Sequence, residues 1–294
     1  MPPVPQMTDT ILRPFTVNGR RLLALTGAAP VGPDAHCVVF VHGALNDHGV
    51  WSGAVEDCLR QGQAVLAPDL PGHGGSEGPA DTDVAAMAGT LVALLQAAGL
   101  ARVTLVGHSM GSLIALDAAA RLADSGEAPR VERLVMVGTA FPMRVAPALL
   151  QQAGEAPLEA IGLIASLSHA GEAAGLPARQ QAGVERMHRV LDGCPPAWLP
   201  EGSRTLLELD LAACDRHEGA PAAMQRLMQA PARPRCHLIC AEQDRMTPVR
   251  RTGLLLEGLQ ARLHLLPQAG HTMMEDDPAG FAAALQAALG DDAG

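Results

Sequence analysis

Short apolar runs alternate with stretches of helical spacing along most of the chain. The first clear strand is expected at 37–41, an apolar run of β-branched and aromatic residues that ends at His42-Gly43. A strand without polar alternation is typical of a parallel sheet that is covered on both faces. Further strands are expected at 64–70, 102–108, 133–139, 236–242 and 261–267. Helices are expected near 51–61, 83–98, 110–122, 248–260 and 278–289. This order predicts an α/β fold with a mostly parallel sheet and right-handed crossovers.

The strand–helix rhythm stops between about residue 143 and residue 217. Helical stretches such as 157–167 and 180–191 are separated there by Gly and Pro, and no strand is indicated. The rhythm then resumes, so the two outer segments are needed together to complete one sheet. We therefore expect an α/β core formed by 1–142 and 218–294, with 143–217 inserted as a helical unit. A second independent domain is the alternative.

Composition narrows the class of protein and of partner. The chain has 294 residues, 48% of them hydrophobic and 18% charged, which is an ordinary globular balance and suits one domain with an insertion. It contains no tyrosine, so no phenol can serve as an acid or as an oxyanion donor. The formal charge of −10 disfavours nucleic acid and anionic lipid as partners. A small-molecule substrate is the expected partner, and the oligomeric state is not indicated.

Three features bear on location. The N-terminal segment has no basic stretch followed by an apolar one, which disfavours a signal peptide. The uncharged stretch between Asp83 and Arg102 has its large apolar residues at helical spacing, which predicts a buried amphipathic helix rather than a membrane span. The six cysteines form no CxxC pair, which favours reduced thiols over a zinc site. We expect a cytoplasmic protein that uses no metal or cofactor.

The strongest chemical signal is the pentad Gly107-His108-Ser109-Met110-Gly111. It follows an apolar strand and opens a helix, the context in which a G-x-S-x-G sequence forms a tight turn that exposes its serine. Glycines are needed where the turn brings backbone segments too close for a Cβ. The following helix N-terminus offers free N–H groups and a positive dipole end, which suit an oxyanion. Ser109 is therefore the candidate nucleophile, although a plain Gly-Ser turn is the alternative.

A serine hydroxyl needs a base to take its proton. His271 follows the last expected strand and Asp244 follows the preceding one, so both lie at the carboxyl edge of the sheet, where open α/β sheets place their sites. The order Ser109, Asp244, His271 matches the order typical of this turn. Asp244 would hold the imidazole tautomer without taking the proton itself.

Other residues compete for these roles. His108 flanks the serine, but adjacent side chains on a sharp turn diverge, and His42 and His73 are expected to bond local backbone. Among the acids, Glu242, Asp215 and Asp276 compete with Asp244. Glu242 would still belong to the strand end. Asp276 is expected to cap a helix start.

Acyl transfer also needs donors for the developing negative oxygen. The backbone N–H of Met110, directly after the nucleophile, is one candidate. The loop after the first strand, 42–47, should supply the second, and Ala44 is our choice. Losing one such donor typically lowers turnover roughly 10²–10³-fold, so this loop must be rigid.

Together these residues resemble an α/β-hydrolase of the lidded esterase, C–C hydrolase and haloperoxidase-like group. The matching motifs are His42-Gly43, Asp69-Leu70-Pro71-Gly72-His73-Gly74, the Ser109 pentad, Asp244 with Thr247-Pro248, and Gly270-His271. The resemblance spans most of the chain, and it implies that 143–217 is a cap over the site and that Asp69 is structural. One departure is Ser112, where many relatives have glycine, and we expect no mechanistic consequence from it.

The hypothesis that follows is a serine hydrolase that cleaves carboxylic esters of small, largely apolar substrates through an acyl-enzyme. The serine argues against the epoxide hydrolases and dehalogenases of this fold, which use Asp. A C–C bond hydrolase or a lactonase with the same triad, or a non-catalytic small-molecule binder, are the alternatives. Apolar residues of the insertion either line a substrate pocket or pack the cap helices together: Met143, Leu149, Ile161, Ile164 and Met187.

Overall fold

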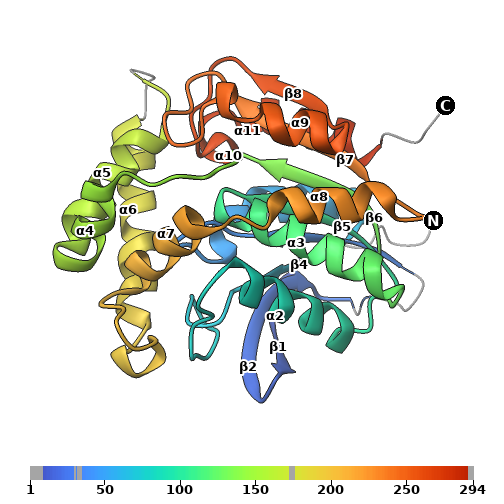
Figure 1. Cartoon of the computed structure of the whole chain (residues 1–294), viewed down its shortest axis with the longest axis horizontal. Coiled ribbons are helices and arrows are strands. Elements are labelled where there is room, and N and C mark those ends of the chain that lie inside the picture. The colour runs from blue at the N-terminus through green and yellow to red at the C-terminus, as the bar shows by residue number, and fades with distance from the viewer. Residues whose placement is uncertain (1–8, 30, 32–34, 172–175, 291–294) are drawn as a thin grey trace.

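The computed structural model describes residues 9–29, 31, 35–171 and 176–290 (Figure 1). Eight strands form one sheet in the order β1-β2-β4-β3-β5-β6-β7-β8. Their bounds are β1 Thr10–Val17, β2 Arg20–Gly27, β3 His36–Val41, β4 Ala64–Pro68, β5 Arg102–His108, β6 Arg130–Val137, β7 Arg235–Ala241 and β8 Arg262–Leu266. From β4 to β8 every neighbouring pair is parallel, whereas β2 is antiparallel to both β1 and β4. The predicted α/β class and all six predicted strands are confirmed.

The hairpin of β1 and β2 was not predicted from the sequence. Its turn is Asn18-Gly19, with φ of 50° and 78°. Two positive φ values on an Asn-Gly pair are the signature of the turn that best matches the twist of a hairpin. The Asn-Gly dipeptide therefore indicated a hairpin turn already in the sequence. The flanking strands were harder to recognise because β1 is an edge strand, most of whose residues are exposed or half-buried.

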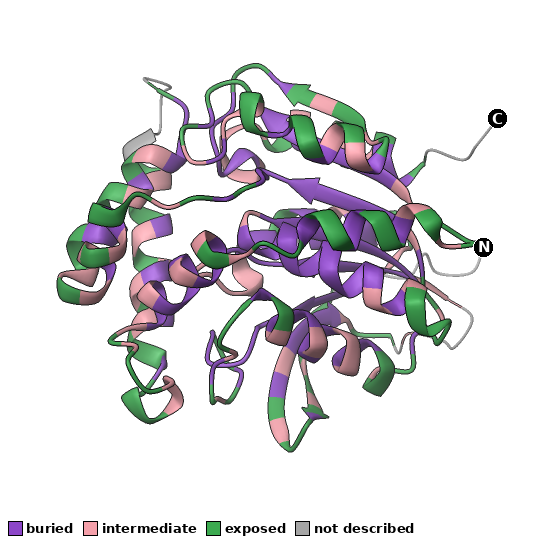
Figure 2. Cartoon of the chain, viewed as in Figure 1, coloured by how far each residue is buried: buried purple, intermediate pink, exposed green. Residues whose placement is uncertain are grey.

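The sheet is covered by helices on both faces. The helices are α1 Ser52–Arg60, α2 Val84–Ala97, α3 Met110–Ser125, α4 Pro147–Glu155, α5 Pro157–Ser168, α6 Leu176–Gly193, α7 Leu206–Arg216, α8 Ala220–Gln229, α9 Gly253–Leu259, α10 Met273–Asp276 and α11 Pro278–Leu289. Short 3₁₀ turns lie at His48–Trp51, Pro196–Trp198 and Val249–Arg251. Strand residues alternate between two apolar cores: Val39 and Val41 pack with α2 and α3, and Val38 and Phe40 pack with α1 and α11. The burial of both faces explains why β3 is apolar throughout. Figure 2 shows the buried strands between helices whose outer sides are exposed.

Helices α4–α7 lie inside the interval predicted as an insertion, and we call them the cap helices. Figure 1 shows them beyond one end of the sheet, on the side to which β6 points. They have an apolar cluster of their own, which includes Ile161, Val190 and Leu207, and Leu45 of the core packs into it. The cap helices therefore rest on the loop that follows β3. The exact boundaries at 143 and 217 stay a prediction.

The uncharged stretch after Asp83 forms α2, a helix of 14 residues whose Met87, Leu91 and Leu94 are buried. Asp83 caps it by accepting a hydrogen bond from the N–H of Ala86 at 2.8 Å. None of the helices in the described part of the chain is both long and apolar enough to cross a bilayer. The expectation of a buried helix at this position is confirmed.

Candidate active site

Ser109 occupies a strained turn between β5 and α3. Its φ of 53° and ψ of −121° lie outside the regions that most side chains adopt, and such strain is concentrated at functional sites. A Cβ on Gly107 would overlap the carbonyl of Gly111, and one on Gly111 would overlap the carbonyl of Val41. The two glycines of the pentad are therefore needed, as expected, because the backbone segments lie too close for a Cβ. The Ser109 N–H donates to Val137 O at 2.9 Å, which fixes the turn against β6.

Ser112 adds a second restraint to this turn. Its hydroxyl lies 2.6 Å from the carbonyl oxygen of Ser109, to which it donates, and 2.7 Å from Thr139 Oγ1. A glycine at this position could make neither contact. The departure from the family pattern thus ties the first turn of α3 to the end of β6.

His271 and Asp244 are brought together from two loops at the carboxyl edge of the sheet. His271 Nδ1 lies 2.9 Å from Asp244 Oδ2, and both residues are buried. Thr247 Oγ1 donates to the same carboxylate oxygen at 2.7 Å and lies 3.1 Å from His271 Nδ1. The other oxygen, Oδ1, accepts the N–H groups of Met246 and Thr247 at 2.8 and 2.7 Å. Thr247 was predicted only as part of a motif, and its role in orienting the pair was missed.

These contacts determine the charge of Asp244. Burial raises the pKa of its carboxyl, but His271 and the hydrogen bonds from Thr247 outweigh burial and hold the pKa well below its ordinary value. The carboxylate is therefore charged at neutral pH and accepts a proton donor at each oxygen. It fixes the Nδ1–H tautomer of His271, which leaves Nε2 free to accept a proton.

Ser109 and His271 line the same cavity. Within the described residues no hydrogen bond joins the hydroxyl to the ring. Catalytic hydrogen bonds are often long before substrate binds, and they tighten in the complex. The backbone of Gly138 and the ring of His108 lie close to His271. There is little room for a side chain at position 138, since a Cβ there would lie 3.2 Å from His271 Nδ1 and 3.3 Å from the His108 ring.

The loop after β3 lies close to Ser109. A Cβ on Gly43 would lie 3.1 Å from the Cβ of Ser109, and Ala44 lines the cavity. Neither the N–H of Ala44 nor that of Met110 donates to another described group. Both amides are thus without a competing acceptor among the described residues.

A buried carboxylate from the cap helices holds this loop in place. Leu45 has a φ of 47°, which is unusual for a leucine, and its N–H donates to Asp210 Oδ2 of α7 at 2.8 Å. His73 Nε2 contacts the same oxygen at 2.8 Å. Burial lowers the pKa of His73, but Asp210 outweighs burial and the net shift is upward. His42 and His73 also bond local backbone as expected, at Gly43 O and Pro71 O. The contact between His73 and Asp210 was missed.

His108 lies against the ring of His271 rather than away from the site. The ring centroids are 4.6 Å apart, and His108 Nε2 donates to the backbone carbonyl of His271 at 3.0 Å. The prediction concerned divergence from the side chain of Ser109, with which His108 shares no hydrogen bond in the described part of the chain, whereas the contact of His108 with His271 was missed. Burial, followed by the nearby His271, lowers the pKa of His108 to about 3.

This depressed pKa makes His108 a source of acid sensitivity. Between its unfolded pKa of about 6.5 and a folded value near 3, the unfolded chain binds the extra proton, so stability falls as pH falls, by at most about 1.4 kcal/mol per pH unit. We expect His108→Gln, which keeps a donor for the His271 carbonyl, to lose less Tm between pH 7 and pH 5 than the wild type. Thermal melts at both pH values measure this.

His48→Gln serves as a control of opposite sign. Burial lowers the pKa of His48, but its hydrogen bond to Asp69 raises the pKa overall. A raised histidine pKa stabilises the fold below about pH 6.5, and that stability is lost as pH rises. This variant should therefore lose more Tm on acidification than the wild type. An unchanged pH dependence in His108→Gln would contradict the assignment.

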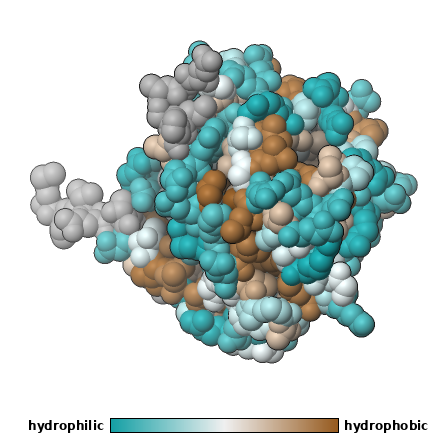
Figure 3. Space-filling model, turned by 90° about the vertical axis from the view of Figure 1, so that its left-hand side faces the viewer, coloured by the Kyte–Doolittle hydropathy of each residue, from teal (hydrophilic) through white to brown (hydrophobic). Residues whose placement is uncertain are grey.

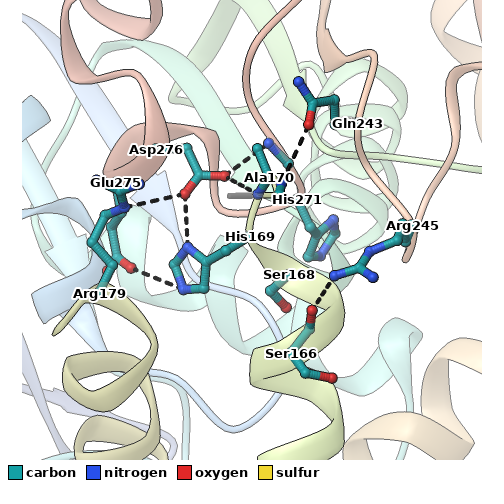
Figure 4. A network of polar contacts seen from close by, with 12 residues as sticks. Ser166, Ser168, His169, Ala170, Arg179, Gln243, Arg245, His271, Glu275 and Asp276 are labelled. Atoms are coloured by element: carbon teal, nitrogen blue, oxygen red, sulfur yellow. Dashed lines mark hydrogen bonds and ion pairs between the residues drawn. The ribbon is translucent and has the colours of Figure 1, made fainter. Parts of the chain in front are cut away.

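The segment after α5 fastens the loop that carries His271 (Figure 4). Asp276 accepts hydrogen bonds from the N–H groups of Gly270 and Ala170 and contacts His169 Nδ1, all within 2.8 Å. The N–H of Thr272 donates to Ser168 O at 2.9 Å. The expectation that Asp276 caps a helix is wrong, because its carboxylate bridges two loops. Asp277, the next residue, caps α11 through the N–H of Gly280.

The cavity above these residues has a volume of about 450 Å³. Apolar side chains from the cap helices and the preceding loop line it, among them Met143, Leu149, Ile164 and Met187. Ile161 instead packs wholly within the cap cluster. Figure 3, which faces the cap side, shows apolar side chains gathered in a central band with hydrophilic ones on either side. The cavity can hold a small apolar group next to Ser109.

Comparison with known proteins agrees with this geometry. A model described as the alpha/beta hydrolase family matches residues 38–284. An uncharacterized protein of Mycobacterium tuberculosis is 28% identical over 304 residues, covering 95% of this chain and 81% of that protein. The sn-1-specific diacylglycerol lipase ABHD11 of Mus musculus is 26% identical over 245 residues, covering 83% and 78%. An esterase structure from Exiguobacterium antarcticum has a TM-score of 0.77 at 18% identity, covering 96% and 100%. The chain belongs to the alpha/beta hydrolase family.

Proposed function

We propose that the chain is a serine hydrolase that cleaves carboxylic esters of small, largely apolar substrates through an acyl-enzyme. The observation that carries the proposal is the buried contact between His271 and Asp244 at the rim of the cavity that Ser109 lines. The mouse relative, whose name describes an ester-cleaving lipase, supports the same class of reaction.

The proposed reaction begins when Ser109 Oγ attacks the ester carbonyl. His271 Nε2 takes the hydroxyl proton while Asp244 stabilises the imidazolium that forms. The N–H groups of Ala44 and Met110 donate to the developing oxyanion. His271 then gives the proton to the leaving alcohol, and the acyl group stays on Ser109. Water, deprotonated by His271, attacks the acyl-enzyme and releases the acid and the free serine.

A fluorophosphonate probe tests the nucleophile directly. We expect the probe to label the wild type on Ser109, because only an activated serine attacks its phosphorus readily. Ser109→Ala should not be labelled, whereas Ser52→Ala, which removes an exposed hydroxyl on α1, should be labelled like the wild type. Intact-protein mass and fragmentation of the labelled peptide report the adduct and its position.

The same experiment separates the alternatives. An adduct on another serine would contradict the assignment of Ser109. A protein that takes no label and hydrolyses no p-nitrophenyl ester would favour the non-catalytic binder. Turnover of a lactone beside acyl esters of increasing chain length then defines which acyl substrates the proposed enzyme prefers.

A further inference from the structure

Arginines gather around the cavity although the chain as a whole is acidic. Five of the residues that line it are arginines: Arg144, Arg186, Arg245, Arg250 and Arg251. Glu275 is the only acidic residue among the described lining residues, so the lining carries a formal charge of 5 − 1 = +4. The whole chain carries −10. The lining of the cavity thus carries an excess of positive charge, in contrast to the whole chain.

Three of these arginines already have partners in the protein. Arg186 binds Glu275 at 2.7 Å and Asn46 Oδ1 at 2.9 Å. Arg144 donates to the carbonyl of Asp215 and lies 3.5 Å from Glu218. Arg245 donates to the carbonyl of Ser166 (Figure 4). These contacts hold the surrounding loops, and the charges of Arg144 and Arg186 are at least partly compensated.

Arg250 and Arg251 differ from the other three. Their guanidinium groups form no hydrogen bond or ion pair with any residue that the structure describes. Both are exposed and lie on the 3₁₀ turn Val249–Arg251, six and seven residues after Asp244. The backbone of this turn is held, because Arg251 N–H donates to Pro248 O at 2.8 Å and Arg251 O accepts from Phe141 at 3.3 Å. Two cations without a partner in the described part of the chain therefore lie on a fixed backbone beside the cavity.

On the basis of the proposed ester hydrolysis, we propose that the preferred substrate carries a carboxylate on the part that fills the cavity, and that Arg250 and Arg251 bind it. A guanidinium fork matches the two oxygens of a carboxylate, and such charge-assisted bonds are the strong ones. The excess of positive charge also attracts an anion to the opening. The apolar lining then contacts the carbon chain between the carboxylate and the ester. Arg250 and Arg251 are specificity residues in this arrangement.

A pair of matched esters tests the proposal. The mono-p-nitrophenyl ester of adipic acid carries a free carboxylate, and its methyl ester is the neutral counterpart. We expect the wild type to prefer the anion in kcat/KM by roughly tenfold at low ionic strength, since one charged hydrogen bond can contribute that factor. The preference should shrink in 0.5 M salt, because the Debye length there is only roughly 4 Å and exposed charges are screened. In Arg250→Gln/Arg251→Gln the anion-to-neutral ratio should fall by about the same factor.

Arg189→Gln/Arg233→Gln is the matched control. It removes the same two charges from exposed arginines that do not line the cavity, so it should keep the wild-type ratio. An equal loss in this control would show that only the overall charge matters, and it would overturn the proposal. No preference for the anion in the wild type would overturn it as well.

A binding measurement keeps this proposal separate from the proposed reaction. Calorimetry should show tighter binding of 4-phenylbutyrate than of neutral 4-phenylbutanamide to the wild type, and loss of that difference in Arg250→Gln/Arg251→Gln. This result would support the carboxylate site even if neither ester is hydrolysed, in which case only the ester hydrolysis fails. Equal affinities for the anion and the amide would overturn the site whatever the esters show.

Discussion

His271→Ala is expected to lower kcat for a p-nitrophenyl ester by roughly 10⁵-fold, because the residues of such a triad act as a unit and the serine without its base is nearly inert. Two other described histidines line the cavity, His108 and His169, and each already has a hydrogen-bond partner in the protein. His108 is buried and donates its Nε2–H to the His271 carbonyl. Initial rates of purified wild type and variant at saturating substrate measure the effect.

Imidazole provides the control for this variant. Removal of the ring leaves a space at the cavity wall, so added imidazole should restore part of the activity of His271→Ala and none of Ser109→Ala. Unchanged thermal stability would show that the loss is chemical. A variant that kept more than about one hundredth of the wild-type kcat would contradict the role of His271 as base.

Asp244→Asn is expected to lower kcat roughly 10³–10⁴-fold while the fold is kept. The two backbone N–H groups at Oδ1 require an acceptor, so the amide oxygen of the asparagine must take that position. Its NH₂ group then faces His271 Nδ1, which has to become an acceptor. The ring proton moves to Nε2, and this nitrogen can no longer accept the proton of Ser109. The hydrogen bonds thus enforce the wrong tautomer.

Asp276→Asn distinguishes this effect from a general loss of charge near the loop. Asp276 bridges the same loop to the cap but does not touch the imidazole of His271. We expect it to lower kcat far less than Asp244→Asn, and to lower Tm instead. Equal losses in the two variants would contradict the assignment of Asp244 as the orienting acid. Steady-state kinetics and thermal melts on both proteins provide the comparison.

The alternation of apolar runs with helical spacing along the chain predicted the central strands of the sheet well. The wholly apolar strands are buried between two helical layers, and their polar boundaries coincide with the loops that carry Ser109, Asp244 and His271. Chain order was enough to select Asp244, since consecutive parallel strands present their loops at one edge. The edge hairpin was missed because most residues of β1 are exposed or half-buried and give a weak hydrophobic pattern, although Asn18-Gly19 marked the turn.

The residues that support the site could not be predicted in this way. Asp210 meets Leu45 across 165 positions of the chain, and Asp276 meets His169 across 107. Such pairs depend on how the cap helices settle on the sheet, and neither spacing nor periodicity encodes that arrangement. The arginines around the cavity come from three separate segments for the same reason.

The bond between Asp210 and Leu45 has a consequence for engineering chimeras of this protein. Because a carboxylate from α7 supports the peptide next to Ala44, a foreign lid grafted onto this scaffold has to bring an equivalent acceptor with it. A transplanted lid without one would leave the amide of Leu45 and the Nε2 of His73 without their present partner in the interior. Donor sequences are therefore best chosen by the acidic residue that they supply at this point, before their pocket shape is considered.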